Sequence, residues 1–414
     1  MAINTLQDKL LQAIQLIEEV RQDLNTPTVY IGLGDNLQNK LADISEGTRV
    51  IIPTNFFWTG SLKIPKPCQL VGGNILGSIR FDAPDISIKA LSLVGAYPND
   101  TLVVTNSRSL IEDSFITGSL NGQRRGILVN SEGVKILRTT VDNIWHKEDS
   151  QAIAGWNGTK NLLIENCPLL EASGENIMFG GADSTSFSDI PSGITIRRCH
   201  LHKPLSWRYR NDLTVKNLFE LKCAKNVLVE DVSMENSWVH GQNGFGVVLT
   251  VRNQDGTSPW STIEDVTMQR ISIKSVAGGV QILGKDDTYI SETMKRVTLK
   301  DWSIIDLSPN FGRNQRTFQF AGQGENINLE NIVVNAPIIP HSALTFSGKP
   351  VKNLSVKGCN FDEGEYGISG DNTGLGVIAL DTYALGYVWS DNLIRTRRSE
   401  TGRVINYPSG TTII

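Results

Sequence analysis

A three-position hydrophobic pattern recurs through most of the chain after residue 80. Each copy has an apolar residue, any residue, a second apolar residue, four further residues and a third apolar residue. Alternation with a period of two is typical of a β-strand. The same offset fits all eleven copies, such as Leu162, Ile164 and Leu169, and Ser109 is the one exception to apolar character. The middle residues are Ile88, Ile111, Ile136, Ile164, Ile196, Val229, Met268, Leu299, Leu329, Val356 and Trp389.

The residue two positions after the middle residue is Asp, Asn or Gly in seven copies, as at Asp113 and Asn331. These residue types tolerate the left-handed backbone conformation, so we expect a tight bend there, followed by a second strand. A further strand is expected before most copies. These strands are predicted at 102–105, 127–130, 152–155, 176–180, 218–222, 246–252, 280–284, 317–320, 343–346 and 377–380.

Three short strands in each unit of about 30 residues predict an all-β fold, a right-handed parallel β-helix. Eleven or more coils are expected, and 47–81 reads as the opening coils. We divide the chain into an N-terminal helix (1–27), the β-helix (28–394) and a short C-terminal extension (395–414). Too few residues follow the last coil for an independent domain.

Residues 3–24 have the spacing of a short coiled coil. Leu6, Leu10, Ala13, Ile17, Val20 and Leu24 form an a/d seam that ends before Pro27. Additional apolar residues widen this face beyond a dimer seam, so we expect a homotrimer. The alternative is an amphipathic helix packed on its own domain.

The overall composition excludes several classes of protein. Lys and Arg number 39 against 43 Asp and Glu, so the net charge of −4 gives no reason to expect a nucleic-acid partner. No stretch approaches the roughly 20 apolar residues of a membrane helix, and charges interrupt any N-terminal signal peptide. The five Cys lack C-x-x-C spacing. Cys167, Cys199 and Cys359 share one position of the repeat, which predicts buried stacking residues. We expect no metal and no cofactor.

The opening GTRVIIPTNFFWTGSLKIP and the coil repeat resemble the pectate-lyase-like β-helix superfamily over about residues 47–394. With an N-terminal helix and no signal peptide, the chain resembles a bacteriophage tailspike. That resemblance implies a virion protein whose N-terminal segment attaches to tail or adaptor proteins and whose β-helix binds or cleaves host surface polysaccharide. The segments DSQAIAGWNG, EASGENIMFGGAD, KPLSWR, VKNLFELK and GQNGFGVVLTVRNQDG also resemble a group of bacterial β-helix proteins, without indicating a chemistry.

The region 142–260 is rich in residues suited to sugars. It holds five of the eight Trp and four of the five His, together with several Arg. Sugars present C–H faces to aromatic rings and hydroxyls to polar groups. The alternative is that these side chains pack under long loops. The predicted substrate-binding residues are Trp156, Trp207, Arg208, Trp238, His240 and Arg252.

Four charged residues are candidates for catalysis. Glu175, Asp183, Glu220 and Lys222 fall on or beside successive predicted strands. A glycoside hydrolase needs two carboxyl groups about 5–5.5 Å or 6.5–9.5 Å apart, and neighbouring coils lie about 4.8 Å apart. A lyase instead needs a base and a cation that stabilises the carboxylate of a uronate.

The strand LFELK places Glu220 and Lys222 on the side facing away from the core, because Phe219 and Leu221 alternate with them. The pair could equally be a surface ladder of opposite charges. Three functions therefore stay open at this point. They are a trimeric phage tailspike, a free bacterial polysaccharide lyase or glycoside hydrolase located outside the cell, and a structural or adhesive β-helix without catalysis.

Overall fold

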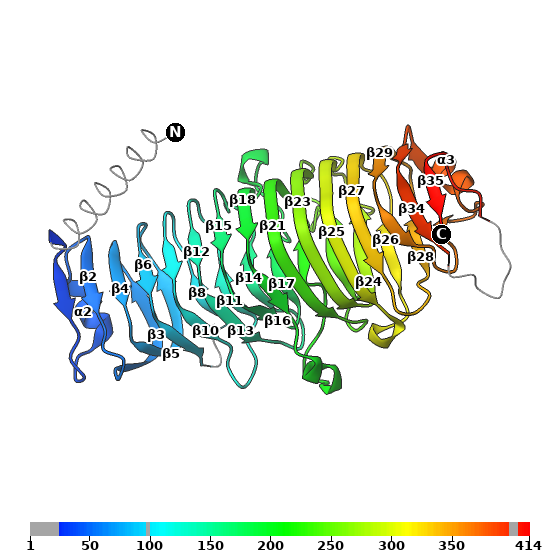
Figure 1. Ribbon diagram of the computed structural model, residues 1–414. Helices are drawn as coiled ribbons and strands as arrows, with labels where there is room; N and C mark the ends of the chain where they lie inside the picture. Colours follow the sequence, from blue (N-terminus) through cyan, green and yellow to red (C-terminus); the bar gives the residue numbers. More distant parts are fainter. Residues whose placement is uncertain (1–24, 97–99, 397–404) are drawn as a thin grey trace, which may run out of the picture.

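The computed structural model describes residues 25–96, 100–396 and 405–414, and these form an elongated rod (Figure 1). Thirty-five strands of the described chain belong to one parallel sheet that coils along the rod. The fold is all-β and consistent with the predicted right-handed parallel β-helix. The predicted coiled-coil seam of residues 3–24 lies outside the described residues.

The first ladder of strands contains the predicted column of middle residues. Each middle residue pairs with that of the next coil, from Ile88 with Ile111 to Val356 with Trp389. The column is buried, so the hydrophobic pattern correctly set the register. Its strands are β1 (Thr28–Tyr30), β2 (Thr48–Ile51), β4 (Cys68–Val71), β6 (Ser87–Lys89), β9 (Leu110–Glu112), β12 (Lys135–Leu137), β15 (Leu163–Glu165), β18 (Ser192–Arg197), β21 (Ala224–Ser237), β23 (Ile263–Val276), β25 (Lys295–Leu307), β27 (Glu325–Asn335), β29 (Val351–Lys357), β32 (Ala384–Leu385) and β33 (Val388–Ser390).

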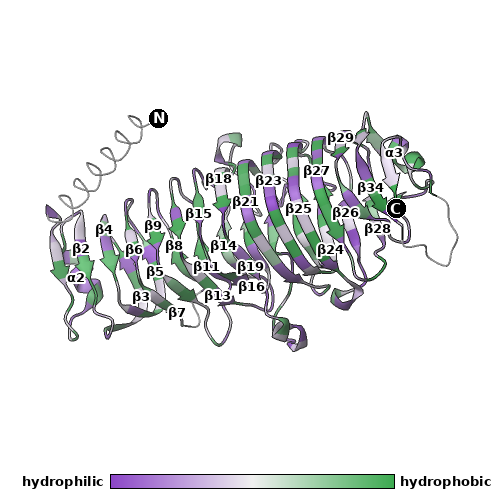
Figure 2. Ribbon diagram, in the orientation of Figure 1, coloured by the Kyte–Doolittle hydropathy of each residue, from purple (hydrophilic) through white to green (hydrophobic). Residues whose placement is uncertain are grey.

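The second ladder follows the bend of each coil and carries the third position of the pattern. The long strands β21, β23, β25 and β27 pass through the bend and belong to both ladders, and hydrophobic and hydrophilic positions alternate along them (Figure 2). The other strands are β3 (Phe57–Ile64), β5 (Asn74–Phe81), β7 (Ser92–Gly95), β10 (Phe115–Thr117), β13 (Thr140–Ile144), β16 (Leu170–Ala172), β19 (His200–His202), β30 (Asn360–Asp362), β34 (Asn392–Arg395) and β35 (Thr411–Ile413).

The third ladder consists of the strands predicted before each copy of the pattern. Nine of the ten form close to their predicted positions. Ile153, Ile177, Phe219 and Val247 continue its buried column from coil to coil. Its strands are β8 (Thr101–Val104), β11 (Arg125–Leu128), β14 (Gln151–Gly155), β17 (Glu175–Phe179), β20 (Phe219–Leu221), β22 (Phe245–Thr250), β24 (Gly278–Leu283), β26 (Arg316–Phe320), β28 (Ser342–Phe346) and β31 (Ile368–Gly370).

All eleven bends after the middle residue have a positive φ. The seven expected Asp, Asn and Gly residues adopt it, and so do Ala90, Arg138, Arg198 and Arg270. A side chain in this conformation costs roughly 1–2 kcal/mol. The three Arg side chains meet carboxyl or amide groups of the preceding coil, as Arg270 meets Asp231 at 2.7 Å. These contacts accompany the strained bends and offset part of their cost.

Two predicted positions were wrong. Leu169 is only half-buried, and Leu170 takes its place in the column beside Val141 and Leu201, because Pro168 lengthens that bend by one residue. The segment 377–380 is not a strand. It belongs to the helix α3 (Val377–Tyr383), whose apolar run buries Ala379 and Leu380, while β31 takes the expected place beside β28.

Both ends of the rod are covered. Helix α2 (Leu37–Asp43) buries Leu37 and Leu41 against the opening coils, while α3 contacts β31 and β32 at the other end. Strand β35 pairs with β34, so the C-terminal extension adds to the sheet.

All five cysteines are free and buried, as predicted for the three in the repeat. No helix in the described part of the chain has the length and apolar character needed to cross a membrane.

Candidate functional site

A cavity of about 750 Å³ opens on the outer side of the third ladder. Strands β20, β22 and β24 form its floor, and segments near 241–243, 252–254 and 286–289 form its walls. Three of the predicted residues line it: Glu220, Lys222 and Arg252. Most of the other lining side chains are amides, hydroxyls and carboxylates. We call this cavity the central pocket.

Glu220 lies at the floor of the central pocket. Phe219 and Leu221 point into the core on either side of it, so the predicted alternation is correct. The carboxyl group is nevertheless buried, since Glu220 is only 2% exposed. Asn217 Nδ2 donates to its Oε2 at 2.9 Å, and Lys222 Nζ lies 4.0 Å from its Oε1. The pair is therefore not the solvent-exposed surface ladder that the sequence also allowed.

The environment of Glu220 favours its protonated form. Burial raises its pKa most, because a charged carboxylate is poorly solvated there. The charge of Glu175 raises it further, while Lys222 and Asn217 lower it. The resulting pKa is about 8. Glu220 thus holds a proton at neutral pH and can donate it into the pocket.

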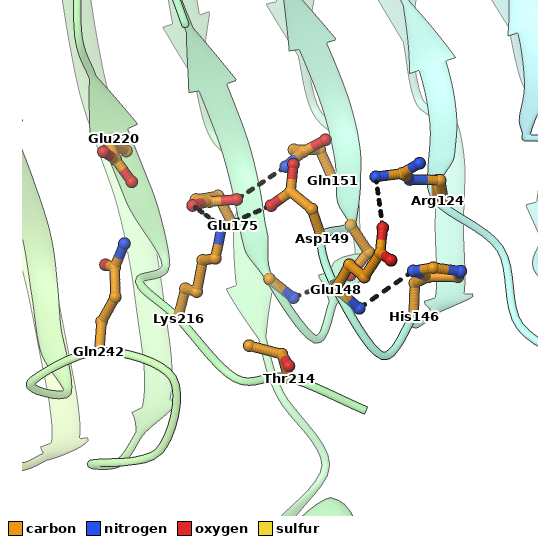
Figure 3. Close-up of polar contacts among 12 residues, drawn as sticks. Arg124, His146, Glu148, Asp149, Gln151, Glu175, Thr214, Lys216, Glu220 and Gln242 are labelled. Atoms are coloured by element: carbon orange, nitrogen blue, oxygen red, sulfur yellow. Dashed lines mark hydrogen bonds and ion pairs between the residues drawn. The ribbon is translucent and has the colours of Figure 1, made fainter. Parts of the chain in front are cut away.

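Glu175 lies one coil before Glu220 and is completely buried (Figure 3). Gln151 Nε2 donates to its Oε2 at 2.8 Å, and Lys216 Nζ lies 3.4 Å from its Oε1. The charge of Glu175 acts on the Glu220 carboxyl group and raises its pKa. The pairing of Glu175 with Glu220 as the two catalytic carboxylates stays a prediction. In the structure Glu175 helps Glu220 keep its proton.

Lys216 links Glu175 to a further carboxylate. Its Nζ lies 2.6 Å from Asp149 Oδ1, and Figure 3 shows it between the Asp149 and Glu175 side chains. Burial acts to lower the pKa of Lys216, but the charges of Glu175 and Asp149 outweigh burial and raise it. Lys216 therefore carries a positive charge that balances part of this acidic cluster.

A buried lysine fixes the chain on both sides of Glu175. Lys203 is 0% exposed, and its Nζ donates to the carbonyls of Ala172 and Gly174 and, at 2.8 Å, to Asn176 Oδ1. Burial lowers its pKa to about 7, although the charge of Glu175 opposes this. Lys203 therefore holds the junction of β16 and β17, where Glu175 begins the strand.

The walls of the central pocket are held by charged contacts. The Arg252 backbone N–H donates to the Lys222 carbonyl at 2.9 Å, and its guanidinium pairs with Asp287. Burial acts to raise the pKa of Asp286, but the backbone N–H groups of Tyr289, Thr288 and Asn253 outweigh it and lower the pKa. Asp286 is thus an ionised structural group, whereas the Asp287 side chain is 61% exposed at the wall.

Two of the three predicted sugar-binding tryptophans are buried. Trp207 and Trp238 are 5% and 4% exposed and belong to a small hydrophobic cluster under the loops. The guanidinium of Arg208 lies over Trp238 and donates to the Asn310 carbonyl. Trp207 and Trp238 therefore pack under the long loops, the alternative that the sequence left open, whereas Arg208 is exposed.

Three further candidates lie outside the lining of the central pocket. Asp183 Oδ2 accepts hydrogen bonds from the backbone N–H groups of Asp255 and Thr257, so this carboxylate holds a loop. Trp156 directly follows β14, two coils before β20, and the Arg125 guanidinium lies 5.4 Å from the centre of its ring. His240 is exposed, and its Nδ1 accepts from the Val215 N–H at 3.3 Å. Its neighbours 241 and 242 line the pocket.

The sequence pattern did not indicate the polar residues that surround Glu175 and Glu220. A coil-by-coil alignment could have found one of them, since Gln151 pairs in register with Glu175. The segments DSQAIAGWNG, VKNLFELK and GQNGFGVVLTVRNQDG contain them all, although their resemblance to other proteins indicated no chemistry. The missed residues are Asp149, Gln151, Lys216, Asn217 and Gln242. Within residues 25–96, 100–396 and 405–414, no group of three His, Cys, Asp or Glu could hold a metal ion.

No family model and no curated protein sequence matches this chain. Among solved structures it is similar to the catalytic domain of a GH87 alpha-1,3-glucanase in complex with nigerose, with 11% identity and a TM-score of 0.53 over 94% of this chain and 66% of that one. It is also similar to a mannuronic acid specific polysaccharide family 6 lyase from human gut microbiota, with 10% identity and a TM-score of 0.50 over 94% and 91%. The tailspike protein of E. coli bacteriophage HK620, solved with a pentasaccharide, matches at 11% identity and a TM-score of 0.46 over 92% and 67%. At these identities the first two similarities show the fold alone.

Proposed function

We propose that this protein binds a polysaccharide along the outer side of the third ladder and cleaves it in the central pocket. The observation that carries the proposal is Glu220. It is a buried carboxyl group with a pKa of about 8, and it lines a polar cavity large enough for sugar rings. A carboxylic acid that is protonated at neutral pH is the group that a glycosidase needs to protonate the leaving oxygen.

In this mechanism Glu220 donates its proton to the glycosidic oxygen as the bond breaks. Lys222, 4.0 Å from the carboxyl group, then stabilises the carboxylate that remains. Glu175 must stay close enough to maintain the raised pKa, and Lys203 and Gln151 position it. Asp287, exposed at the pocket wall beside Arg252, is the carboxylate that can activate water on the other side of the sugar.

A lyase reaction is the second candidate, and the two cations of the pocket favour it. Lys222 and Arg252 both line the cavity and could bind the carboxylate of a uronate. The two reactions leave different products. A lyase creates an unsaturated uronate with its own ultraviolet absorbance, whereas a hydrolase releases two saturated ends.

The wider role that we propose is that of a homotrimeric bacteriophage tailspike. The a/d seam of residues 3–24 supports a trimer whose N-terminus attaches to tail or adaptor proteins, and the β-helix would act on host surface polysaccharide. The resemblance in sequence and the parallel β-helix fold support this role. The alternatives are a free bacterial enzyme outside the cell and an adhesive β-helix without catalysis. The mass of the full chain in solution tests the trimer.

The test of the proposed activity is a depolymerisation assay. A panel of purified bacterial capsular polysaccharides and lipopolysaccharides is incubated with the full-length protein, and product size and new ends are measured. We expect at least one substrate to be shortened by the wild type and not by Glu220→Gln. Binding without shortening would favour an adhesive role, and absence of binding across the panel would contradict a carbohydrate function.

A further inference from the structure

A second cavity, of about 530 Å³, lies on the third ladder nearer the C-terminal end of the rod. Strands β26, β28 and β31 contribute Arg316, Thr345 and Ser369 to its lining, and the segments flanking β28 and β31 contribute His341, Tyr366 and Asp371. None of these residues was singled out by the sequence, and none lines the central pocket.

One row of side chains connects the two cavities. The strand register pairs Glu220 with Val248, Val248 with Gln281, Gln281 with Gln319, Gln319 with Thr345, and Thr345 with Ser369. The first three residues line the central pocket and the last two line the second cavity, so only the coil of Gln319 separates the two. In Figure 1 the strands β24, β26 and β28 follow one another along the rod.

The row faces outward along its whole length. Phe320 and Phe346, the residues next to Gln319 and Thr345, are buried in the core, so alternation turns the row to the other side. Neighbouring strands lie about 4.8 Å apart, so the five steps from Glu220 to Ser369 span about 24 Å. A ligand that fills both cavities must therefore be a chain of several sugars.

The lining of the second cavity has the chemistry that binds sugars. The Nε of Arg316 is a buried donor with no hydrogen-bond partner in the described chain, and its Nη1 donates to Asn314 Oδ1 at 3.1 Å. The rings of His341 and Tyr366 lie 4.8 Å apart and present an aromatic surface. Hydroxyls of Thr345 and Ser369 complete a set of groups that can meet ring faces and sugar hydroxyls.

We infer that the second cavity is a subsite that binds a distant part of the same polysaccharide chain that occupies the central pocket. The polysaccharide then runs along the rod, across the coils, from Glu220 to Ser369. The inference rests on the proposed function. It specifies the direction in which the polysaccharide lies on the rod and the shortest ligand that can reach both cavities. Once a long fragment is bound in one cavity, its binding in the second cavity is an intramolecular step. Long fragments that reach both cavities therefore gain affinity, and short fragments do not.

Binding by fragment length tests this inference in the Glu220→Gln background, where ligands are not consumed. The probes are disaccharide and decasaccharide fragments, made by partial acid hydrolysis of the panel polysaccharide that the wild type binds most tightly. The variants are Arg316→Ala, which removes the unpaired donor, and Ser369→Trp, which fills the cavity. Lys352→Ala, an exposed lysine on β29 of the first ladder, is the matched control.

We expect either change to weaken binding of the decasaccharide at least about tenfold, the equivalent of about 1.4 kcal/mol, and to leave disaccharide binding in the central pocket unchanged. Equal decasaccharide affinity in both variants and the control would overturn the inference while leaving the proposed function intact. If a variant fails to fold, as judged by its melting, the other one decides. If no polysaccharide binds the wild type, the proposed function and this inference both fail.

Discussion

Two groups of acidic residues lie on the outer side of consecutive strands of different ladders, and their surroundings shift their pKa values in opposite directions. Glu230 and Asp231 of β21 are partly exposed and meet Arg270 of the next coil, which holds the pKa of Asp231 below its usual value. Glu220 of β20 is buried beside Glu175, and its pKa is raised to about 8. Residue type alone therefore does not distinguish a carboxylate in a structural ion pair from a carboxyl group that can act as an acid.

Repetition along the rod separates the two groups. The pairing at Arg270 recurs at Arg138 with Glu112 and Asp113, and at Arg198 with Glu165, always at the bend of a coil. A contact that recurs in coil after coil has a structural role in the coil, at its bend. We call these contacts the bend ladder. The cluster around Glu220 has no such repetition and lies where the loops lengthen, as expected for a site of chemistry.

The largest expected effect comes from removing the proton of Glu220. Glu220→Gln keeps the shape of the side chain and its contact with Asn217, but it cannot act as an acid. We expect cleavage of the panel polysaccharide to fall by at least about 10²-fold, the low end for loss of a general acid, with melting close to that of the wild type.

The matched control for this change is Glu230→Gln in the bend ladder. It also removes one carboxylate, but at a position paired with Arg270 outside both cavities. Its cleavage rate should equal that of the wild type. Similar losses in the two variants would show that the contrast between the groups has no functional meaning.

A second comparison concerns buried and exposed lysines. Lys203→Met leaves the buried acceptors Ala172, Gly174 and Asn176 without their donor, at roughly 1–3 kcal/mol for each unsatisfied group. We expect chemical denaturation to show a loss of about 3 kcal/mol or more, with a slower cleavage rate because Glu175 shifts. Lys352→Met, at an exposed surface pair, should change stability by less than about 0.5 kcal/mol. Equal stability of the two variants would remove the structural role of Lys203.

Stability as a function of pH gives the next comparison, with opposite signs for two groups. Between pH 4.5 and about 8 the folded chain holds a proton on Glu220 that the unfolded chain has lost, so the free energy of unfolding falls as pH rises. Between about 7 and 10.5 the folded chain has lost the proton of Lys203, so this group makes the free energy of unfolding rise with pH. Denaturation across pH should show each slope disappear in Glu220→Gln and in Lys203→Met. A wild-type curve that the two variants merely shift in parallel would refute both assignments.

The smallest effect is expected in the bend ladder itself. Arg270→Ala removes a largely exposed pair and should lower the melting temperature only slightly, because solvent screens exposed ion pairs. Because Arg270 has a φ of 54°, Arg270→Gly should partly compensate by relieving backbone strain. Thermal melting of the two variants checks this, and a loss of several kcal/mol in either would mean that the ladder is a major source of stability.

The fold could be predicted from sequence because burial imposes a repeating pattern. Every coil must place apolar residues at the same positions, so the column from Ile88 to Trp389 was readable, and the pattern failed only where Pro168 lengthened a bend and where the rod ended at α3. The outward direction of Glu220 followed from the same alternation.

The rest of the site could not be predicted because its partners come from segments without a repeat. The bonds of Lys203 to Ala172, Gly174 and Asn176 join residues about 30 apart, and the burial of Trp207 depends on how the long loops fold over one another. Neither has a local signature in the sequence. The composition surplus of Trp and Arg correctly marked the irregular region, but it did not distinguish loop packing from ligand contact.

Burial, reinforced by the charge of Glu175, keeps Glu220 protonated at neutral pH. The direct measurement is a carbon-13 NMR titration of the Glu220 side-chain carboxyl in the full-length protein, assigned by its loss in Glu220→Gln, and repeated in Glu175→Gln. We expect a pKa of about 8 in the wild type and a lower value in Glu175→Gln. A wild-type pKa near the usual 4.5 would contradict it.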